Sequence, residues 1–166
     1  MADMYQSEKN LLEKLADAVP GLKGYRDKEA RRDTDKRFRE YLASRIDRAR
    51  GSTEDIKRTL MNDGLLERLD DVDRLSQKLI KLAGLIRHAS YGYSGFFDQV
   101  KIQEMELDKI YQYDLSLLTD VEALESSLNE FPSRPLDEMY KEWEQKVRTL
   151  ETRIEERKNL FTVQGQ

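Results

Sequence analysis

The chain lacks cysteine and has few residues that interrupt helices. Among its 166 residues there are no Cys, 8 Gly and 3 Pro. The missing cysteine excludes a disulfide framework, thiolate catalysis and a cysteine-ligated metal site. The single histidine, His88, excludes a di-metal carboxylate centre, because that centre requires a Glu-x-x-His motif on each of two helices.

Long hydrophobic runs are also missing. No apolar segment approaches the roughly 20 residues of a transmembrane helix, and MADMYQSEKNLLEKL carries charges where a secretory signal has its apolar core. We therefore expect a soluble, cytoplasmic protein, with peripheral contact at the inner face of the membrane as the alternative. Charged residues make up 37% and hydrophobic residues 38%, and their regular spacing indicates amphipathic helices, not disorder.

The few glycines and prolines divide the chain into predicted helices. The capping-box-like Ser52-Thr-Glu-Asp55 predicts that a new helix begins just after Gly51, and Asn62-Asp-Gly64 predicts an interruption or bend. We expect a single helical domain over 1–166, with an amphipathic N-terminal segment (1–19), core helices (25–130) and a C-terminal helix. The expected segments are helices at 4–19, 25–49, 52–90, 102–130 and 135–160, a turn at 131–135 and a tail at 161–166.

Apolar residues alternate at spacings of three and four within 52–90, 102–130 and 135–160, which is the seam pattern of coiled coils and slender bundles. Further apolar residues beside the seams favour a bundle that is buried on more than one side. The sequence therefore predicts an all-α fold, an elongated antiparallel bundle of four to five helices with coiled-coil-like seams. The last seam reads Leu136, Tyr140, Trp143, Val147, Leu150, Ile154, Arg157 and Phe161.

Asp114 is a polar residue at a seam position of helix 102–130. If this helix is antiparallel to helix 52–90 about the intervening corner, Asp114 lies near the level of Leu79 and pairs with Arg74 or Lys78. A polar seam residue of this kind sets helix register or oligomeric state. The alternative is a hydrated carboxylate at the rim of a wider bundle, and the periodicity does not choose between them.

Residues 25–37 form the most charged stretch, with ten charged residues in thirteen. From Lys23 to Arg50 there are eleven Lys and Arg against six Asp and Glu, a net of +5, and the remainder carries −9. Pairs in which an acidic residue precedes a basic one by four positions, such as Asp35–Arg39, neutralise much of this charge within the helix and disfavour nucleic-acid binding. The stretch has almost no apolar face, so we expect it to begin outside the bundle as a partner-contact arm. Its candidate contact residues are Arg26, Arg31, Arg32 and Arg37.

The stretch LIRHASYGYSGFF (85–97) is predicted to cap the corner between helices 52–90 and 102–130 with aromatic rings. Its rings are also candidate partner contacts. We expect His88 near the terminal carbonyls of its helix. An enzyme using His88 with Ser90, Ser94 or Asp98 is the alternative, but no nucleophile elbow accompanies them. We therefore assign no catalytic, cofactor-binding or metal-binding residue. The candidate contacts of the corner are Tyr91, Tyr93, Phe96 and Phe97.

Three segments carry a resemblance to a known family: GYRDKEARRDTDKRFREYL (24–42), ASYGYSGFFDQVKI (89–102) and LDKIYQYDLSLL (107–118). Over about residues 20–125 the chain resembles an uncharacterised bacterial all-helical family associated with gene neighbourhoods of phage-shock and SPFH-type membrane-stress proteins. This resemblance implies a non-enzymatic interaction or scaffold protein in membrane-stress complexes, with protein partners or self-association. Peripheral membrane binding or phage-shock-like self-assembly is the alternative. Helix 4–19 departs from the phage-shock protein A pattern, because it lacks a basic polar face.

Overall fold

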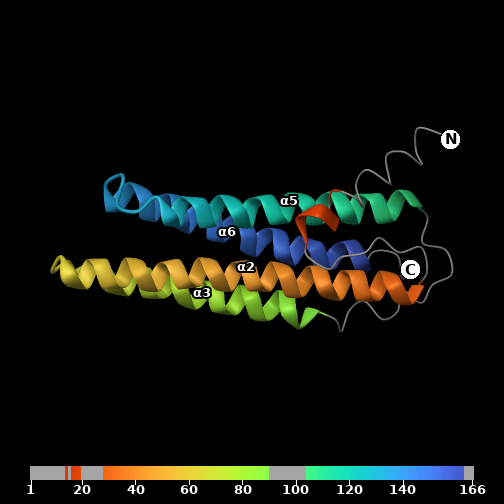
Figure 1. Cartoon of the computed structure of the whole chain (residues 1–166), viewed down its shortest axis with the longest axis horizontal. Coiled ribbons are helices and arrows are strands. Elements are labelled where there is room, and N and C mark those ends of the chain that lie inside the picture. Colours follow the sequence, from red (N-terminus) through yellow and green to blue (C-terminus); the bar gives the residue numbers. More distant parts are fainter. Residues whose placement is uncertain (1–13, 15, 20–27, 90–103, 163–166) are drawn as a thin grey trace.

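The computed structural model describes residues 14, 16–19, 28–89 and 104–162, and the side chains of 28–33, 104–108 and 161–162 are not described (Figure 1). Within these residues the chain is all-α, as predicted. Four long α-helices and a short 3-10 helix make up the described fold. They are α2 (Lys28–Asn62), η1 (Leu66–Arg68), α3 (Leu69–Arg87), α5 (Glu104–Asn129) and α6 (Leu136–Thr162).

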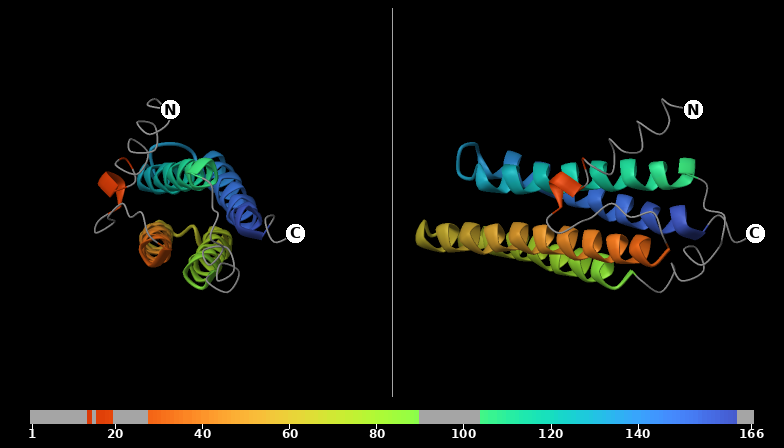
Figure 2. Two further views of the ribbon diagram at one scale, coloured as in Figure 1. Left: turned by 90° about the vertical axis from the view of Figure 1, so that its right-hand side faces the viewer. Right: turned by 45° about the vertical axis from the view of Figure 1, so that its right-hand side comes forward.

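The four long helices form two antiparallel hairpins, α2–α3 and α5–α6, that pack side by side in an elongated bundle (Figures 1 and 2). Across the interface between the hairpins, α2 packs on α5 and α3 packs on α6. These neighbours run parallel, since residues of rising number pair in order along both helices. The pairs that show this are Arg45–Glu125 and Ser52–Asn129 for α2 and α5, and Arg68–Asp137 and Lys81–Glu151 for α3 and α6.

The α2–α3 turn lies at Asn62–Leu65, where the chain reverses direction. The Leu65 N–H donates to the Leu60 carbonyl at 2.9 Å, and the Gly64 N–H donates to the Met61 carbonyl at 3.2 Å. This pair of bonds is a Schellman cap. Gly64 supplies the left-handed residue that the cap requires, with φ +71°. The predicted interruption at 62–64 is therefore a full reversal.

The predicted helix boundary after Gly51 is wrong. Helix α2 is unbroken at Gly51. Its whole length is 35 residues, which is about 52 Å. The reason is an uninterrupted buried stripe, because its spacing of three and four crosses Gly51 without a shift and tertiary packing outweighs the weak helix propensity of glycine. The stripe consists of Leu42, Ile46, Ala49, Thr53, Ile56 and Leu60.

The projecting start predicted for the charged stretch is wrong at its C-terminal end. Thr34 and Asp35 are already buried, at 3% and 8% exposure, ahead of the apolar Phe38. Sequence reasoning expected burial to begin at Phe38 because a charged face is costly to bury. The cost at Asp35 is offset by a buried guanidinium from α6, described below.

One hydrophobic core runs through the bundle and draws residues from all four helices. The lone tryptophan, Trp143, lies fully inside it, and Phe131 from the α5–α6 turn packs edge-on against its ring with the centroids 6.1 Å apart. The Trp143 indole N–H is buried and has no hydrogen-bond partner within the described ranges. None of the described helices is long and apolar enough to cross a membrane.

Candidate functional site

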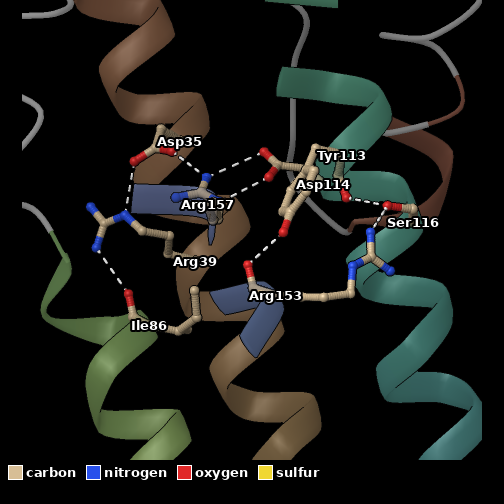
Figure 3. A network of polar contacts seen from close by, with 8 residues as sticks. All are labelled: Asp35, Arg39, Ile86, Tyr113, Asp114, Ser116, Arg153 and Arg157. Atoms are coloured by element: carbon tan, nitrogen blue, oxygen red, sulfur yellow. Dashed lines mark hydrogen bonds and ion pairs between the residues drawn. The ribbon is translucent and has the colours of Figure 1, made fainter. Parts of the chain in front are cut away.

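A buried cluster of charged side chains joins the two hairpins near the N-terminal end of α2 (Figure 3). Its members, here called the ion network, are Asp35 and Arg39 of α2, Asp114 of α5 and Arg157 of α6. All four are buried, and Arg157 is fully so. Charged groups are rarely buried unless they are paired, so the pairing within this cluster decides its energetics.

Arg157 is the hub of the ion network. Its Nε donates to Asp114 Oδ1 at 2.8 Å, and its Nη2 donates to Asp114 Oδ2 at 3.2 Å. The same Nη2 donates to Asp35 Oδ1 at 2.6 Å. A planar guanidinium suits this arrangement, because two N–H groups can engage one carboxylate while another reaches a second. The Phe38 ring lies against the guanidinium, with 5.6 Å between the Arg157 Cζ and the ring centroid.

Arg39 extends the ion network to the fourth helix. Its Nε donates to Asp35 Oδ2 at 2.8 Å, which is one of the pairs expected from the sequence. Its Nη1 donates to the Arg87 carbonyl at 2.9 Å and the Ile86 carbonyl at 3.4 Å. These carbonyls belong to the last turn of α3, where helices leave acceptors unsatisfied and favour a positive charge. The network therefore contacts all four long helices.

The ion network has two carboxylates and two guanidinium groups, so it is neutral when all four are charged. Burial nevertheless raises the pKa of Asp114 from 3.8 to about 6, because loss of hydration outweighs the attraction and hydrogen bonds of Arg157. Asp35 adds to the rise by like-charge repulsion. The Asp114 carboxylate is held ionised by Arg157, so loss of that partner would leave a costly buried charge.

This geometry corrects the expectations for Asp114. The hydrated-rim alternative is wrong, since Asp114 is only 3% exposed. The predicted partners Arg74 and Lys78 are also wrong, because α5 packs on α2 and α6, and Arg157 is the partner. Arg74 instead pairs with Asp71 on the surface at 2.6 Å. The register-setting role of Asp114 stays a prediction, now one that rests on Arg157 of the next helix along the chain.

An outer layer of polar contacts ties α5 to α6 beside the ion network (Figure 3). The Tyr113 hydroxyl donates to the Arg153 carbonyl at 2.6 Å, and the Arg153 guanidinium lies over the Tyr113 ring and contacts Ser116 and Asp120. Burial raises the pKa of Tyr113 above its ordinary value. These residues are partly exposed, so the ion pair between Arg153 and Asp120 contributes little to stability. Breaking it costs much less than breaking a buried ion pair.

A different feature lies at the opposite end of α2. Met61, Leu65 and Leu66 flank the α2–α3 turn and are exposed by 57%, 40% and 60% of their surface. We call these three residues the apolar tip. In the described part of the chain, Ile80 is the remaining large hydrophobic residue with comparable exposure, and it lies about 21 Å further along α3.

Most of the residues predicted as partner contacts are not among those whose side chains the structure describes. Arg31 and Arg32 lie within α2 but their side chains are not described, and Arg37 is exposed on α2. His88 directly follows α3, where its backbone N–H donates to the Gly84 carbonyl at 3.0 Å, and its side chain is exposed. The residues that lie outside the described ranges are Arg26, Ser90, Tyr91, Tyr93, Ser94, Phe96, Phe97 and Asp98.

Sequence reasoning did not single out Arg157, the hub of the ion network, although the sequence carries a signal for it. Arg157 occupies a seam position of helix 135–160, just as Asp114 occupies one of helix 102–130. Two seam residues of opposite charge on adjacent helices are the signal for a buried pair. Asp35 gave no such signal, because it lies within a stretch that is charged on every side.

The described side chains include no group of three or more His, Cys, Asp or Glu placed to hold a metal ion. In the ion network every carboxylate already accepts hydrogen bonds from a guanidinium, which suits it to holding helices together. A scan of protein-family models, a search of curated proteins and a search of solved structures each returned no match.

Proposed function

We propose that the protein is a non-enzymatic helical interaction protein that binds a protein partner through the apolar tip. The observation that carries the proposal is the gathering of exposed apolar side chains at one turn. Single exposed hydrophobic residues are ordinary on protein surfaces, whereas several at one place are typical of an interaction site. Three of the four large exposed hydrophobic residues in the described ranges belong to the tip.

The interior supports this proposal by giving the tip a rigid support. The ion network and the continuous core fix α2 against α3, α5 and α6. A contact surface on such a frame loses little conformational freedom on binding, which favours affinity. The resemblance to a family of membrane-stress gene neighbourhoods suggests complexes of that kind as the setting. The arm around Arg31 and Arg32 is retained as a second candidate surface, at the other end of α2.

Site-specific photo-crosslinking tests the proposal in the protein's own cells. A p-benzoylphenylalanine replaces Leu66 of the tip, Arg37 of the arm, or Gln77 of α3, which is a matched exposed position away from both. After irradiation, adducts are identified by mass spectrometry. We expect a discrete protein adduct from position 66 and none from position 77.

Each other pattern of adducts revises the proposal. An adduct from position 37 alone would move the contact surface to the arm. Equal adducts from positions 66 and 77 would show collisional labelling, and the absence of adducts at every position would remove the interaction function. An adduct with the mass of two chains would make the partner a second copy.

A further inference from the structure

The charges around the apolar tip indicate what kind of partner it fits. Asp63, Glu67 and Asp70 are all exposed and lie within the same ten residues as the tip, 61–70. No ion pair engages any of the three among the described residues. Arg68, which follows Glu67 in the sequence, already pairs with Asp71 at 3.2 Å and with Asp137 of α6. The tip is therefore an apolar surface with a negative rim of three carboxylates outside ion pairs, although Arg74 attracts Asp70 at longer range.

The negative rim argues against several occupants. Anionic lipid headgroups and nucleic-acid phosphates would be repelled by it. Two copies meeting tip to tip would bring their carboxylates together, and like charges disfavour that arrangement.

The rest of this chain does not supply a matching segment either. Residues 25–37 are basic but have almost no apolar face, and the amphipathic stretch 4–19 carries more acids than bases. A segment that satisfies both the apolar tip and its rim must combine apolar and basic side chains. Residues 36–50 of α2 combine basic and apolar side chains, but their apolar face is buried in the core of the bundle and cannot cover the tip of a second copy.

We infer that the apolar tip binds a cationic amphipathic helical segment of another protein. The apolar side chains of that segment, spaced along one helical face, cover Leu66 and Met61. Its lysines and arginines pair with Asp63, Glu67 and Asp70. Such charge complementarity selects the partner and its orientation, while apolar burial supplies most of the affinity. This inference rests on the proposed function of the tip as a contact surface.

Fluorescence anisotropy with designed peptides tests the inference on the full chain. The probes are a labelled Leu/Lys amphipathic helix and a Leu/Glu peptide of the same length and pattern. We expect the Leu/Lys peptide to bind at least about tenfold more tightly than the Leu/Glu peptide, and to weaken as salt screens the rim. The variant Leu66→Ser should weaken binding by about tenfold, the effect of leaving one leucine uncovered.

A matched pair of charge variants separates the rim from diffuse attraction. Asp63→Asn with Glu67→Gln removes two charges at the tip, and Glu40→Gln with Glu155→Gln removes two exposed charges elsewhere. Circular dichroism confirms that all variants remain helical. We expect only the tip pair to weaken binding of the Leu/Lys peptide. Equal weakening by both pairs would overturn the inference.

Two further outcomes separate this inference from the proposed function. If position 66 captures a partner in cells but the Leu/Lys peptide shows no preference, the chemistry inferred for the partner is wrong and the interaction function stands. If sedimentation shows dimers that Leu66→Ser abolishes, the occupant is a second copy and the inference is overturned. If neither capture nor peptide binding occurs, both fail together.

Discussion

Replacing Arg157 with methionine tests the role of the ion network most directly. Methionine keeps much of the length of the side chain and removes the charge. The guanidinium that it deletes donates to Asp114 at 2.8 and 3.2 Å and to Asp35 at 2.6 Å. Asp35 retains Arg39 as a partner, whereas Asp114 loses the one cation that pairs with it among the described side chains. The substitution therefore creates one uncompensated buried carboxylate.

The expected cost follows from that single unpaired charge. Breaking a buried ion pair from one side destabilises proteins by about 3–5 kcal/mol, because the remaining charge has lost its hydration and its partner. A protein of this size has a free energy of unfolding of about 5–15 kcal/mol. We therefore expect Arg157→Met to lose about 3–5 kcal/mol at pH 7, a large share of the total.

The loss should depend on pH in a defined direction. Without Arg157, Asp114 keeps only the longer-range attraction of Arg39 among the described cations that lower its pKa, so its folded-state pKa rises further above the unfolded value. A carboxyl with a raised folded-state pKa contributes stability that is present below the unfolded pKa and is lost as pH rises through the folded pKa. The deficit of Arg157→Met relative to wild type should therefore be smallest near pH 4 and grow toward pH 8.

Two control variants isolate the cause. Arg153→Met, one turn earlier on α6, breaks the partly exposed pair with Asp120 and should cost only about 1 kcal/mol. The double variant Asp114→Leu with Arg157→Met removes both charges and leaves Asp35 paired with Arg39. Replacing a buried ion pair by apolar residues is often neutral or stabilising, so the double variant should recover most of the loss.

Urea denaturation followed by circular dichroism and Trp143 fluorescence measures these free energies, because Trp143 is the only tryptophan and is fully buried. The reasoning is refuted if Arg157→Met costs no more than Arg153→Met at pH 7. It is also refuted if the double variant is no more stable than the single one.

Three further predictions concern other parts of the bundle. For the wild type, the raised pKa of Asp114 should contribute a loss of about 2 kcal/mol in stability as pH rises from 4 to 6, and Asp114→Asn should lack this component in urea titrations at each pH. Gly51→Ala should raise the free energy of unfolding by about 0.5–1 kcal/mol, because a methyl group there meets no atom within 4 Å. Gly64→Ala should lower the free energy of unfolding, because its φ of +71° is strained for a residue with a side chain. Thermal melts should show melting-temperature shifts of opposite sign for the two variants. Trp143→Phe should change stability by less than about 1 kcal/mol, since deleting an unpaired buried donor offsets lost ring packing; a loss above about 3 kcal/mol by circular dichroism would mean that the indole N–H is satisfied in solution.

The sequence was most informative about the helices themselves. Alternating apolar spacings and the scarcity of glycine and proline predicted an all-α bundle, and helices 102–130 and 135–160 match α5 and α6 within two residues at each end. The boundary at Gly51 failed because a local capping pattern was given more weight than the continuous stripe from Leu42 to Leu60. In a long helix, tertiary packing along one face decides continuity, and a single glycine does not interrupt it.

The site was less accessible to sequence reasoning, because it depends on which helices are neighbours. Asp114 was singled out correctly as a polar seam residue, but its partner was sought on helix 52–90. That choice assumed that helices adjacent in the sequence are adjacent in space. In the bundle α3 and α5 lie across the diagonal, so α5 meets α2 and α6. The exposure of the apolar tip was equally hidden, because periodicity gives the spacing of hydrophobic residues and not what covers them.

The sequence separations within the ion network bear on how the bundle assembles. The α2–α3 and α5–α6 hairpins each join helices through short turns, so their internal contacts close small loops and can form early. The contact between Arg157 and Asp35 spans 122 residues and requires both hairpins to be docked. An interaction made only at that last step contributes little to the rate of folding and much to the barrier against unfolding. The Arg157–Asp35 contact would thus act mainly on the lifetime of the folded bundle, holding two quickly formed hairpins together once they have met.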